Sequence, residues 1–146
     1  MGIADDFHIN RKKDLLQISF PSTMENIDLA DKETRKFLTD HDLPSEVFSV
    51  CLCMREGLTN AVRHGNRDDA SKTVQYSLAL SGNRLIMEIS DEGEGFDWKR
   101  IGEKEPLFAS DHGRGLVIIR RYFSSYRFNA RGNKLTMVKI LPSDPS

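Results

Sequence analysis

The most informative stretch of this chain is Glu56-Gly-Leu-Thr-Asn60-Ala-Val-Arg63-His64-Gly65. Between residues 46 and 64, apolar side chains recur every three or four positions, which predicts a helix with one buried stripe. Glu56, Asn60 and His64 are spaced four apart and therefore share a neighbouring stripe of that helix. Gly65 with Asn66 is expected to end it, because glycine accepts the left-handed conformation that closes many helices.

An acid and an amide one helical turn apart can act on the same bound molecule. The amide oxygen of Asn60 could coordinate magnesium, and the carboxylate of Glu56 could accept a proton from an attacking hydroxyl group. The spacing alone is explained equally by an ordinary solvated helix face. His64 could contact a phosphate, act as a favourable cation at the helix C-terminus, or be a satisfied core histidine. Other segments must decide between these interpretations.

Two later segments point to a nucleotide. Asp91-Glu-Gly93-Glu-Gly95-Phe96 follows a predicted strand, where a carboxylate could accept the amino proton of adenine and glycines allow close approach of the backbone. Gly113-Arg114-Gly115-Leu116 opens a predicted helix whose free N–H groups could bind a polyphosphate. An ordinary turn and a chance GxG pattern explain each segment alone, so only their combination and order are specific.

Periodicity elsewhere predicts further strands and helices around an aperiodic stretch over residues 91–111. Strands are expected at Leu15–Phe20, Thr73–Leu80, Arg84–Ser90, Tyr126–Ala130 and Lys134–Leu141. A helix is expected to start at a capping box, Ser22–Glu25, and to break at Asp40–Pro44, and another covers Gly115–Phe123. Cys51 and Cys53 would point about 200° apart on a helix, which predicts two buried thiols.

Composition narrows the class of protein. A length of 146 residues, with 38% hydrophobic and 29% charged side chains, predicts one globular domain over residues 1–146. The formal net charge of -1 gives no overall field for nucleic acid or an anionic membrane. No apolar run approaches about 20 residues and no leader pattern begins the chain, so a cytoplasmic location is expected. The patterns of nucleophilic hydrolases, zinc proteases and P-loop proteins are absent from the sequence.

Together the segments resemble the motifs of the GHKL ATPases, the superfamily of gyrase, histidine kinase and related chaperone and mismatch-repair ATPase domains. Within it they resemble the anti-sigma factor serine kinases of bacterial partner switching. The N box E-x-x-x-N-A-x-x-H-G is matched by Glu56, Asn60, Ala61, His64 and Gly65, the D-x-G-x-G-F box by Asp91, Gly93, Gly95 and Phe96, and the G-x-G-[LF] box by Gly113, Gly115 and Leu116. Pro106-Leu-Phe108 resembles the start of the ATP lid, and the resemblance runs from about Leu15 to Leu141.

The resemblance implies an α/β (α+β) two-layer sandwich, in which helices cover one face of a mixed, mostly antiparallel sheet. It implies ATP and Mg²⁺ as cofactors, with Asn60 as magnesium ligand, Asp91 as the residue that reads adenine, and Glu56 as general base. The other nucleotide-binding residues that it implies are Arg63, His64, Gly93, Gly95, Phe96, Gly113, Arg114, Gly115, Leu116 and Thr136. Of these, Thr136 resembles the threonine that such domains place near adenine, and Arg63 or Arg114 could neutralise phosphate charge.

The implied activity is that of a protein serine/threonine kinase and anti-sigma factor, which converts ATP and protein serine into ADP and phosphoprotein. Its expected substrate is an anti-anti-sigma (STAS-type) protein, with a sigma factor as second partner, a homodimer as assembly, and no direct contact with nucleic acid or membrane. Only Ala-Ser-Asp-His separates Phe108 from Gly113, and no arginine directly precedes the GxG box, so the γ-phosphate contact is open. A non-catalytic ATP- or ADP-binding module and a stand-alone histidine kinase catalytic domain are the alternatives.

Overall fold

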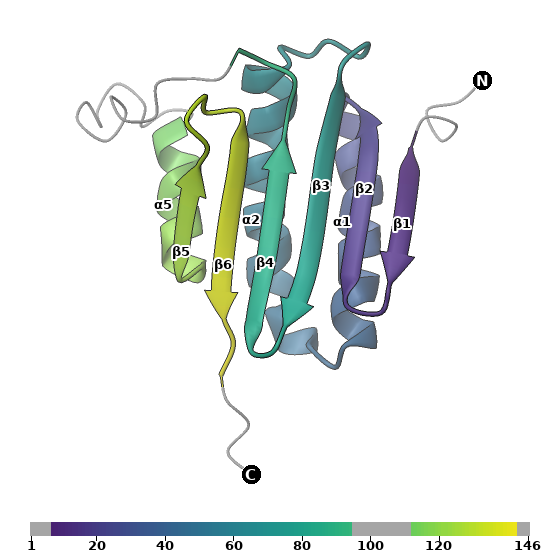
Figure 1. The fold of residues 1–146 in the computed structure, drawn as a ribbon, viewed down its shortest axis with the longest axis vertical. Coiled ribbons are helices and arrows are strands. Elements are labelled where there is room, and N and C mark those ends of the chain that lie inside the picture. Colours follow the sequence, from purple (N-terminus) through teal and green to yellow (C-terminus); the bar gives the residue numbers. More distant parts are fainter. Residues whose placement is uncertain (1–6, 95–111, 143–146) are drawn as a thin grey trace.

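The computed structural model describes residues 7–94 and 112–142, which form two layers (Figure 1). Six strands make one sheet in the order β1-β2-β3-β4-β6-β5. The strands are β1 (His8–Lys12), β2 (Leu15–Pro21), β3 (Thr73–Ser81), β4 (Arg84–Ser90), β5 (Ser125–Phe128) and β6 (Lys134–Ile140). The helices are α1 (Met24–Asp40), α2 (Val47–Asn60) and α5 (His112–Tyr122), with a short 3₁₀ turn η2 (Pro44–Glu46) and a π turn η3 (Ala61–Gly65).

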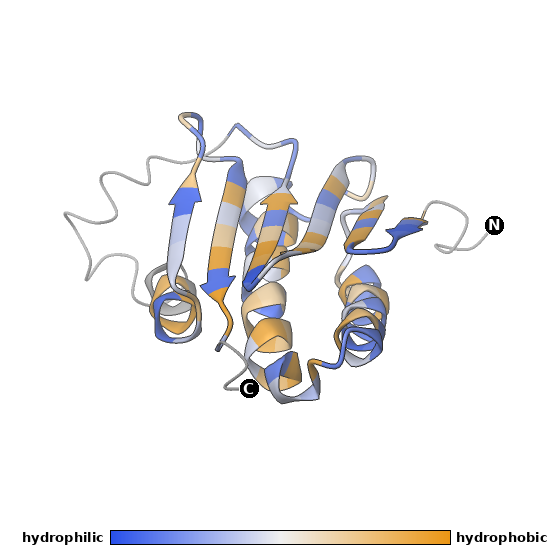
Figure 2. Cartoon of the chain, turned by 60° about the horizontal axis from the view of Figure 1, so that its bottom comes forward, coloured by the Kyte–Doolittle hydropathy of each residue, from blue (hydrophilic) through white to orange (hydrophobic). Residues whose placement is uncertain are grey.

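The three α-helices pack on the same face of the sheet, and the hydrophobic core lies between the two layers (Figures 1 and 2). Strand β4 shows why: Leu85, Met87 and Ile89 are buried under the helices, while the residues between them are only half-buried on the open face. The expected two-layer sandwich is therefore confirmed. The sheet was expected to be mixed and mostly antiparallel, and every strand pair that the structure describes is antiparallel.

Helix α1 begins one residue later than the expected capping box. Its N-cap is Thr23, and the side-chain hydroxyl of Ser22 is buried without a hydrogen-bond partner in the described structure. The side chain of Asn26, three residues after the N-cap, donates to Thr23 Oγ1 at 3.0 Å and to the Pro21 carbonyl at 2.9 Å. The side chain of Asn26, in the first turn of the helix, therefore bonds back to the residues before the helix. No N-cap side chain accepts a hydrogen bond from the first turn in the usual way.

Helix α2 ends in the π turn η3, in which the Asn66 N–H donates to the Ala61 carbonyl at 2.8 Å. The stop at Gly65 and Asn66 was expected, but the reason given for it is wrong. Gly65 does not adopt a positive φ, and the left-handed residues are Arg67 and Asp68, at φ of 54° and 57°. A π turn adds one residue to a helical turn, and such turns are frequent at functional sites.

The edge strand β1 was not expected from the sequence. It contains one apolar residue, Ile9, among polar and basic ones, so it lacks the alternation that identifies a half-buried strand. Exposed basic side chains such as Arg11 and Lys12 are common on free edges, where they oppose pairing with other chains.

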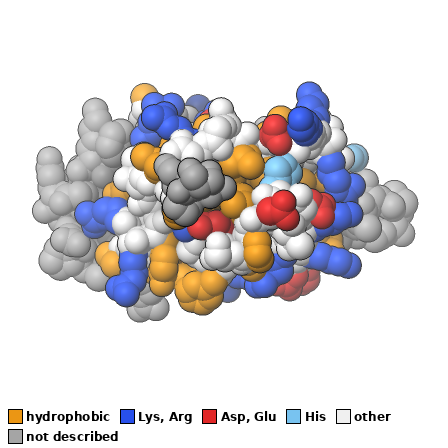
Figure 3. All heavy atoms as spheres, turned by 90° about the horizontal axis from the view of Figure 1, so that it is seen from below, with side chains coloured by type: hydrophobic (Ala, Val, Ile, Leu, Met, Phe, Trp, Pro, Cys, Tyr) orange, Lys and Arg blue, Asp and Glu red, His pale blue; other side chains and the backbone are white. Residues whose placement is uncertain are grey.

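The lower end of the molecule in Figure 1 carries side chains of every class. Figure 3, a view of this end, shows basic side chains around the margin, with acidic and hydrophobic ones between them. Such mixing agrees with a formal net charge of -1. In the described ranges, no helix is both long and apolar enough to cross a bilayer.

Candidate functional site

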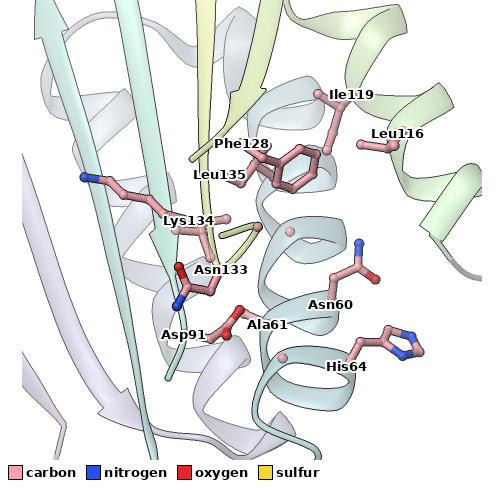
Figure 4. Close-up of a pocket in the computed structure, with 14 residues that line it drawn as sticks. Asn60, Ala61, His64, Asp91, Leu116, Ile119, Phe128, Asn133, Lys134 and Leu135 are labelled. Atoms are coloured by element: carbon pink, nitrogen blue, oxygen red, sulfur yellow. The ribbon is translucent and has the colours of Figure 1, made fainter. Parts of the chain in front are cut away.

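A cavity opens between the C-terminal end of α2, the sheet strands β4 and β6, and helix α5 (Figure 4). The residues that line it are Gly57, Asn60, Ala61, His64, Gly65, Ile89, Asp91, Leu116, Ile119, Phe128, Gly132, Asn133, Lys134 and Leu135. In Figure 4, Asn60 and His64 project from the helix, whereas Asp91 and Asn133 lie on the sheet side. Segments that are far apart in the sequence therefore converge on one hollow.

Gly57 brings α2 close to the sheet beside this cavity. A Cβ atom at Gly57 would lie 2.5 Å from Ile89 Cδ1 and 3.5 Å from Met137 Cε. A glycine inside a helix costs about 1 kcal/mol relative to alanine, so this position is either needed for close packing or a tolerated flaw. The distances decide for close packing, since a larger residue would push α2 away from β4 and β6.

Asp91 is enclosed by two glycines from different motifs. A Cβ atom at Gly65 would overlap the Asp91 carboxylate, and one at Gly93 would overlap the carbonyl oxygen of Gly65. The N–H of Gly93 donates to Asp91 Oδ1 at 2.8 Å. The end of the helical motif and the loop after β4 are thus in direct contact, although 25 residues separate Gly65 from Asp91 in the chain.

Burial raises the pKa of Asp91 above its ordinary value. The hydrogen bond from the Gly93 N–H and the positive charge of Lys72 act in the opposite direction and lower this pKa, but they do not cancel the effect of burial. A carboxylate that has lost part of its solvation gains more from a donor that a ligand supplies.

The turn between β5 and β6 forms a third wall, which sequence reasoning did not assign to the site. The Asp91 N–H donates to the Asn133 carbonyl at 3.0 Å, and Asn133 Nδ2 donates to the Gly93 carbonyl at 3.2 Å. The turn itself is held by Asn129 Oδ1, which accepts from the N–H groups of Gly132, Asn133 and Lys134 at 2.8, 3.0 and 3.2 Å. Arg131-Gly-Asn133 separates two expected strands and is a turn signal, but nothing in that pattern indicates which cavity the turn faces.

Apolar side chains cover the inner part of the cavity. They are Ile89 and Leu135 from the sheet, Phe128 from β5, and Leu116 and Ile119 from α5. The polar groups lie toward one end, where Asp91, Asn133, Asn60 and His64 are found. An apolar slot with a few polar groups at one end suits a flat heterocycle that carries a polar edge.

The predicted site residues fall into three groups. Asn60, His64, Asp91 and Leu116 line the cavity. Glu56, Arg63, Gly93 and Thr136 do not line it. Gly95, Phe96 and the lid stretch 106–108 lie outside the described residues, and Gly113, Arg114 and Gly115 belong to the first turns of α5, where the side chains are not described.

Each residue of the second group has a definite place. Glu56 is half-buried on α2 one turn before Asn60, Arg63 is exposed, and Gly93 is buried beneath Asp91. Thr136 lies on the open face of the sheet, where its hydroxyl donates to Glu88 Oε2 at 3.4 Å. Strand alternation explains this, since its neighbours Leu135 and Met137 face the helices. The structure therefore does not bring Thr136 to the cavity.

Comparison with known proteins gives one family and several relatives. The model of the histidine kinase-like ATPase domain matches residues 20–139. The chain is 28% identical over 133 residues to the anti-sigma F factor of Oceanobacillus iheyensis, and 23% identical over 133 residues to that of Anoxybacillus flavithermus; each match covers 86% of this chain and 90% of the relative. It is 27% identical over 105 residues to the serine-protein kinase RsbW of Bacillus subtilis, which covers 66% of both chains.

Proposed function

Because this chain belongs to the histidine kinase-like ATPase domain family, we propose that its cavity binds ATP and that the protein is an ATP-dependent protein serine kinase. The observation that carries the proposal is the enclosure of Asp91 by Gly65 and Gly93 at the polar end of an apolar slot. This arrangement offers a fixed acceptor beside room for a flat ring.

Adenine has the complementary chemistry. Asp91 Oδ1 accepts the Gly93 N–H, while Oδ2 accepts no hydrogen bond within the described residues and would take the exocyclic amino group of the base. Ile89, Phe128 and Leu135 would remove water from the ring faces. A guanine base carries a carbonyl oxygen at the corresponding position, which would repel the Asp91 carboxylate.

Asn60 is the residue that would hold Mg²⁺. Its side chain is half-buried and projects from α2 at the cavity (Figure 4). Magnesium in nucleotide sites takes one or two protein oxygens and completes its shell with phosphate oxygens and water. Such an ion needs no cage of protein ligands, and residues 7–94 and 112–142 contain no group of three His, Cys, Asp or Glu side chains that could form one. Bound there, it would neutralise phosphate charge.

Glu56 is the proposed proton acceptor. In the reaction, the serine oxygen forms a bond to the γ-phosphorus, the bond from that phosphorus to the bridging oxygen of ADP breaks, and the hydroxyl proton passes to the Glu56 carboxylate. Glu56 stands one helical turn before Asn60 but outside the residues that line the cavity. Its role therefore needs a test of its own.

The names of the relatives support a choice of substrate. Because they are called anti-sigma F factor and serine-protein kinase, we propose a serine of an anti-anti-sigma partner as phosphoacceptor, and a sigma factor as the protein that is held in its absence. A cytoplasmic homodimer is part of the same proposal. A second candidate, a module that binds nucleotide without transferring phosphate, is favoured by the position of Glu56 outside the cavity lining.

Phosphoryl transfer distinguishes the candidates. The protein is incubated with radiolabelled ATP, Mg²⁺ and a STAS-type protein from the same genome, and we expect phosphoserine that survives acid. Glu56→Gln should bind ATP normally yet lose about 100-fold or more in transfer rate, which is the usual contribution of a general base. The exposed helical residue Glu25 offers a matched control, since Glu25→Gln makes the same change away from the cavity.

Each outcome of these experiments supports or excludes one candidate function. An active Glu56→Gln variant would remove Glu56 as base. Retention of ATP without transfer to the partner would favour the binding module, and an acid-labile product would indicate phosphohistidine chemistry instead.

A further inference from the structure

Asn66 is a fully buried polar residue beside the site, and no expectation from the sequence gave it a role beyond ending the helix. Its exposed fraction is 0%. Its amide nitrogen donates to the Thr73 carbonyl at 3.1 Å, and its Oδ1 accepts the Glu92 N–H at 2.8 Å. Its own N–H donates to the Ala61 carbonyl at 2.8 Å. One side chain thus ties the end of the π turn to the start of β3 and to the loop after β4.

The hydrogen bonds of Asn66 lie next to the contact between the helix end and Asp91. Gly65, the residue before Asn66, packs against the Asp91 carboxylate, and Glu92, the residue bonded to Asn66, follows Asp91 in the chain. The loop and the helix end are therefore joined by a hydrogen bond between the two residues that follow Gly65 and Asp91. A shift of the loop along the helix end would break the bond to Glu92 and would also move Asp91, the neighbouring residue that lines the cavity.

We infer that Asn66 is a positioning residue for Asp91: it fixes the loop that carries Asp91 against the helix end and so sets how the carboxylate faces a nucleotide base. This inference rests on the proposed function, because it assumes that Asp91 reads adenine. Asn66 does not line the cavity, so it acts through Asp91 and not through contact with ligand.

The amide suits this role better than its isosteres. It must donate to a carbonyl and accept from an N–H at once, which neither a carboxylate nor a leucine can do. An aspartate would place an oxygen against the Thr73 carbonyl while keeping the acceptor for Glu92. Other bonds hold the same loop. The Glu92 carboxylate accepts the Thr73 N–H, and the turn between β5 and β6 bonds to the loop at Asp91, Gly93 and Glu94. The loop should therefore loosen, not detach, when Asn66 is changed.

The test compares two buried asparagines. Asn26 also has an exposed fraction of 0%, and its amide nitrogen also donates to protein groups, but its bonds stay within the connection from β2 to α1. Asn66→Ala and Asn26→Ala should both lower the melting temperature. At a temperature where circular dichroism shows both variants to be folded, calorimetric titration with Mg·ATP and with Mg·GTP then measures the affinity of the site for each nucleotide.

We expect Asn66→Ala to weaken ATP binding by about tenfold or more, the loss that corresponds to 1.4 kcal/mol, and to shrink the preference for ATP over GTP. Asn26→Ala should bind ATP within about twofold of the unchanged protein, because the site is intact. A purely structural residue would lower the melting temperature without moving the ratio of the two affinities. An unchanged ratio and affinity in Asn66→Ala would overturn the inference.

Further variants keep the test decisive. If Asn66→Ala does not fold, Asn66→Asp is measured in the same way, with the same expected fall in the ratio. If neither folds, amide exchange in the unchanged protein is followed, where the Glu92 N–H should become at least about tenfold more protected when ATP binds, and equal protection would contradict the inference. Failure of the unchanged protein to bind ATP would instead refute the proposed function itself.

Discussion

At the scale of single residues, the site depends on two glycines whose lack of a side chain lets neighbouring groups approach. Gly65 leaves room for the Asp91 carboxylate, Gly93 leaves room for the backbone carbonyl of Gly65, and neither is required for a left-handed conformation. The sequence identified both glycines and the aspartate but not their mutual contact. Such a contact depends on how two distant segments pack, which local pattern does not encode.

Gly65→Ala should damage both stability and binding. The new Cβ would overlap the Asp91 carboxylate, so either this side chain or the loop that carries it must move. We expect a loss of about 1–3 kcal/mol in unfolding free energy together with weaker ATP binding. Urea unfolding and calorimetric titration measure the two effects on the same preparation.

Gly82→Ala is the matched control for that change. Gly82 has a φ of +61° in the turn between β3 and β4, with open space around its Cβ position, so alanine there costs about 1 kcal/mol of strain. The ATP affinity of the Gly82→Ala variant should equal that of the unchanged protein. Equal affinity in Gly65→Ala as well would show that the enclosure of Asp91 does not matter for binding.

At the scale of elements, the sequence located most strands and helices but misjudged the ends of several. The strand expected at Arg84–Ser90 is observed with those bounds, because alternation and a turn at Gly82 both mark it. The π turn after α2 and the one-residue shift of the α1 cap were not foreseen. Both depend on which of several polar side chains finds a partner in the folded chain, and such choices are made by tertiary contacts.

The end of helix α1 is fixed by His41. Ring Nδ1 lies 2.8 Å from the Phe37 carbonyl, and Nε2 lies 2.7 Å from the Lys13 carbonyl and 3.2 Å from Asp14 Oδ1. Burial lowers the pKa of His41, but these acceptors on both ring nitrogens outweigh it, so that the pKa is raised above its ordinary value. Only the protonated ring can donate from both nitrogens and so tie α1 to the turn between β1 and β2.

Folding stability should therefore fall as the pH rises. A histidine whose folded pKa exceeds its unfolded value of about 6.5 contributes stability that is fully present below that value and lost as the pH passes the folded pKa. Urea unfolding of the protein and of His41→Gln at a series of pH values isolates this contribution as the difference between the two curves. A difference that does not change with pH would show that His41 does not titrate as described.

At the scale of the whole molecule, the cavity exists because the sheet order places β6 beside β4. The β5–β6 turn then meets the loop after β4, and helix α5 covers the same end of the sheet. Periodicity predicted most of the strands, and the combination of the motifs, together with the resemblance, suggested that Asn60 and Asp91 share a pocket. Thr136 illustrates the limit, since its strand was expected correctly while the face on which it lies was not.

The central claim, that Asp91 and its surroundings form an adenine site, is tested most directly by calorimetric titration of Mg·ATP into the protein and into Asp91→Asn. The substitution places an N–H₂ group where the amino group of adenine would need an acceptor, and it changes the volume of the side chain very little. The account predicts that the unchanged protein binds ATP and that Asp91→Asn loses about tenfold or more in affinity. Absence of ATP binding by the unchanged protein, or equal affinity in the variant, would contradict it.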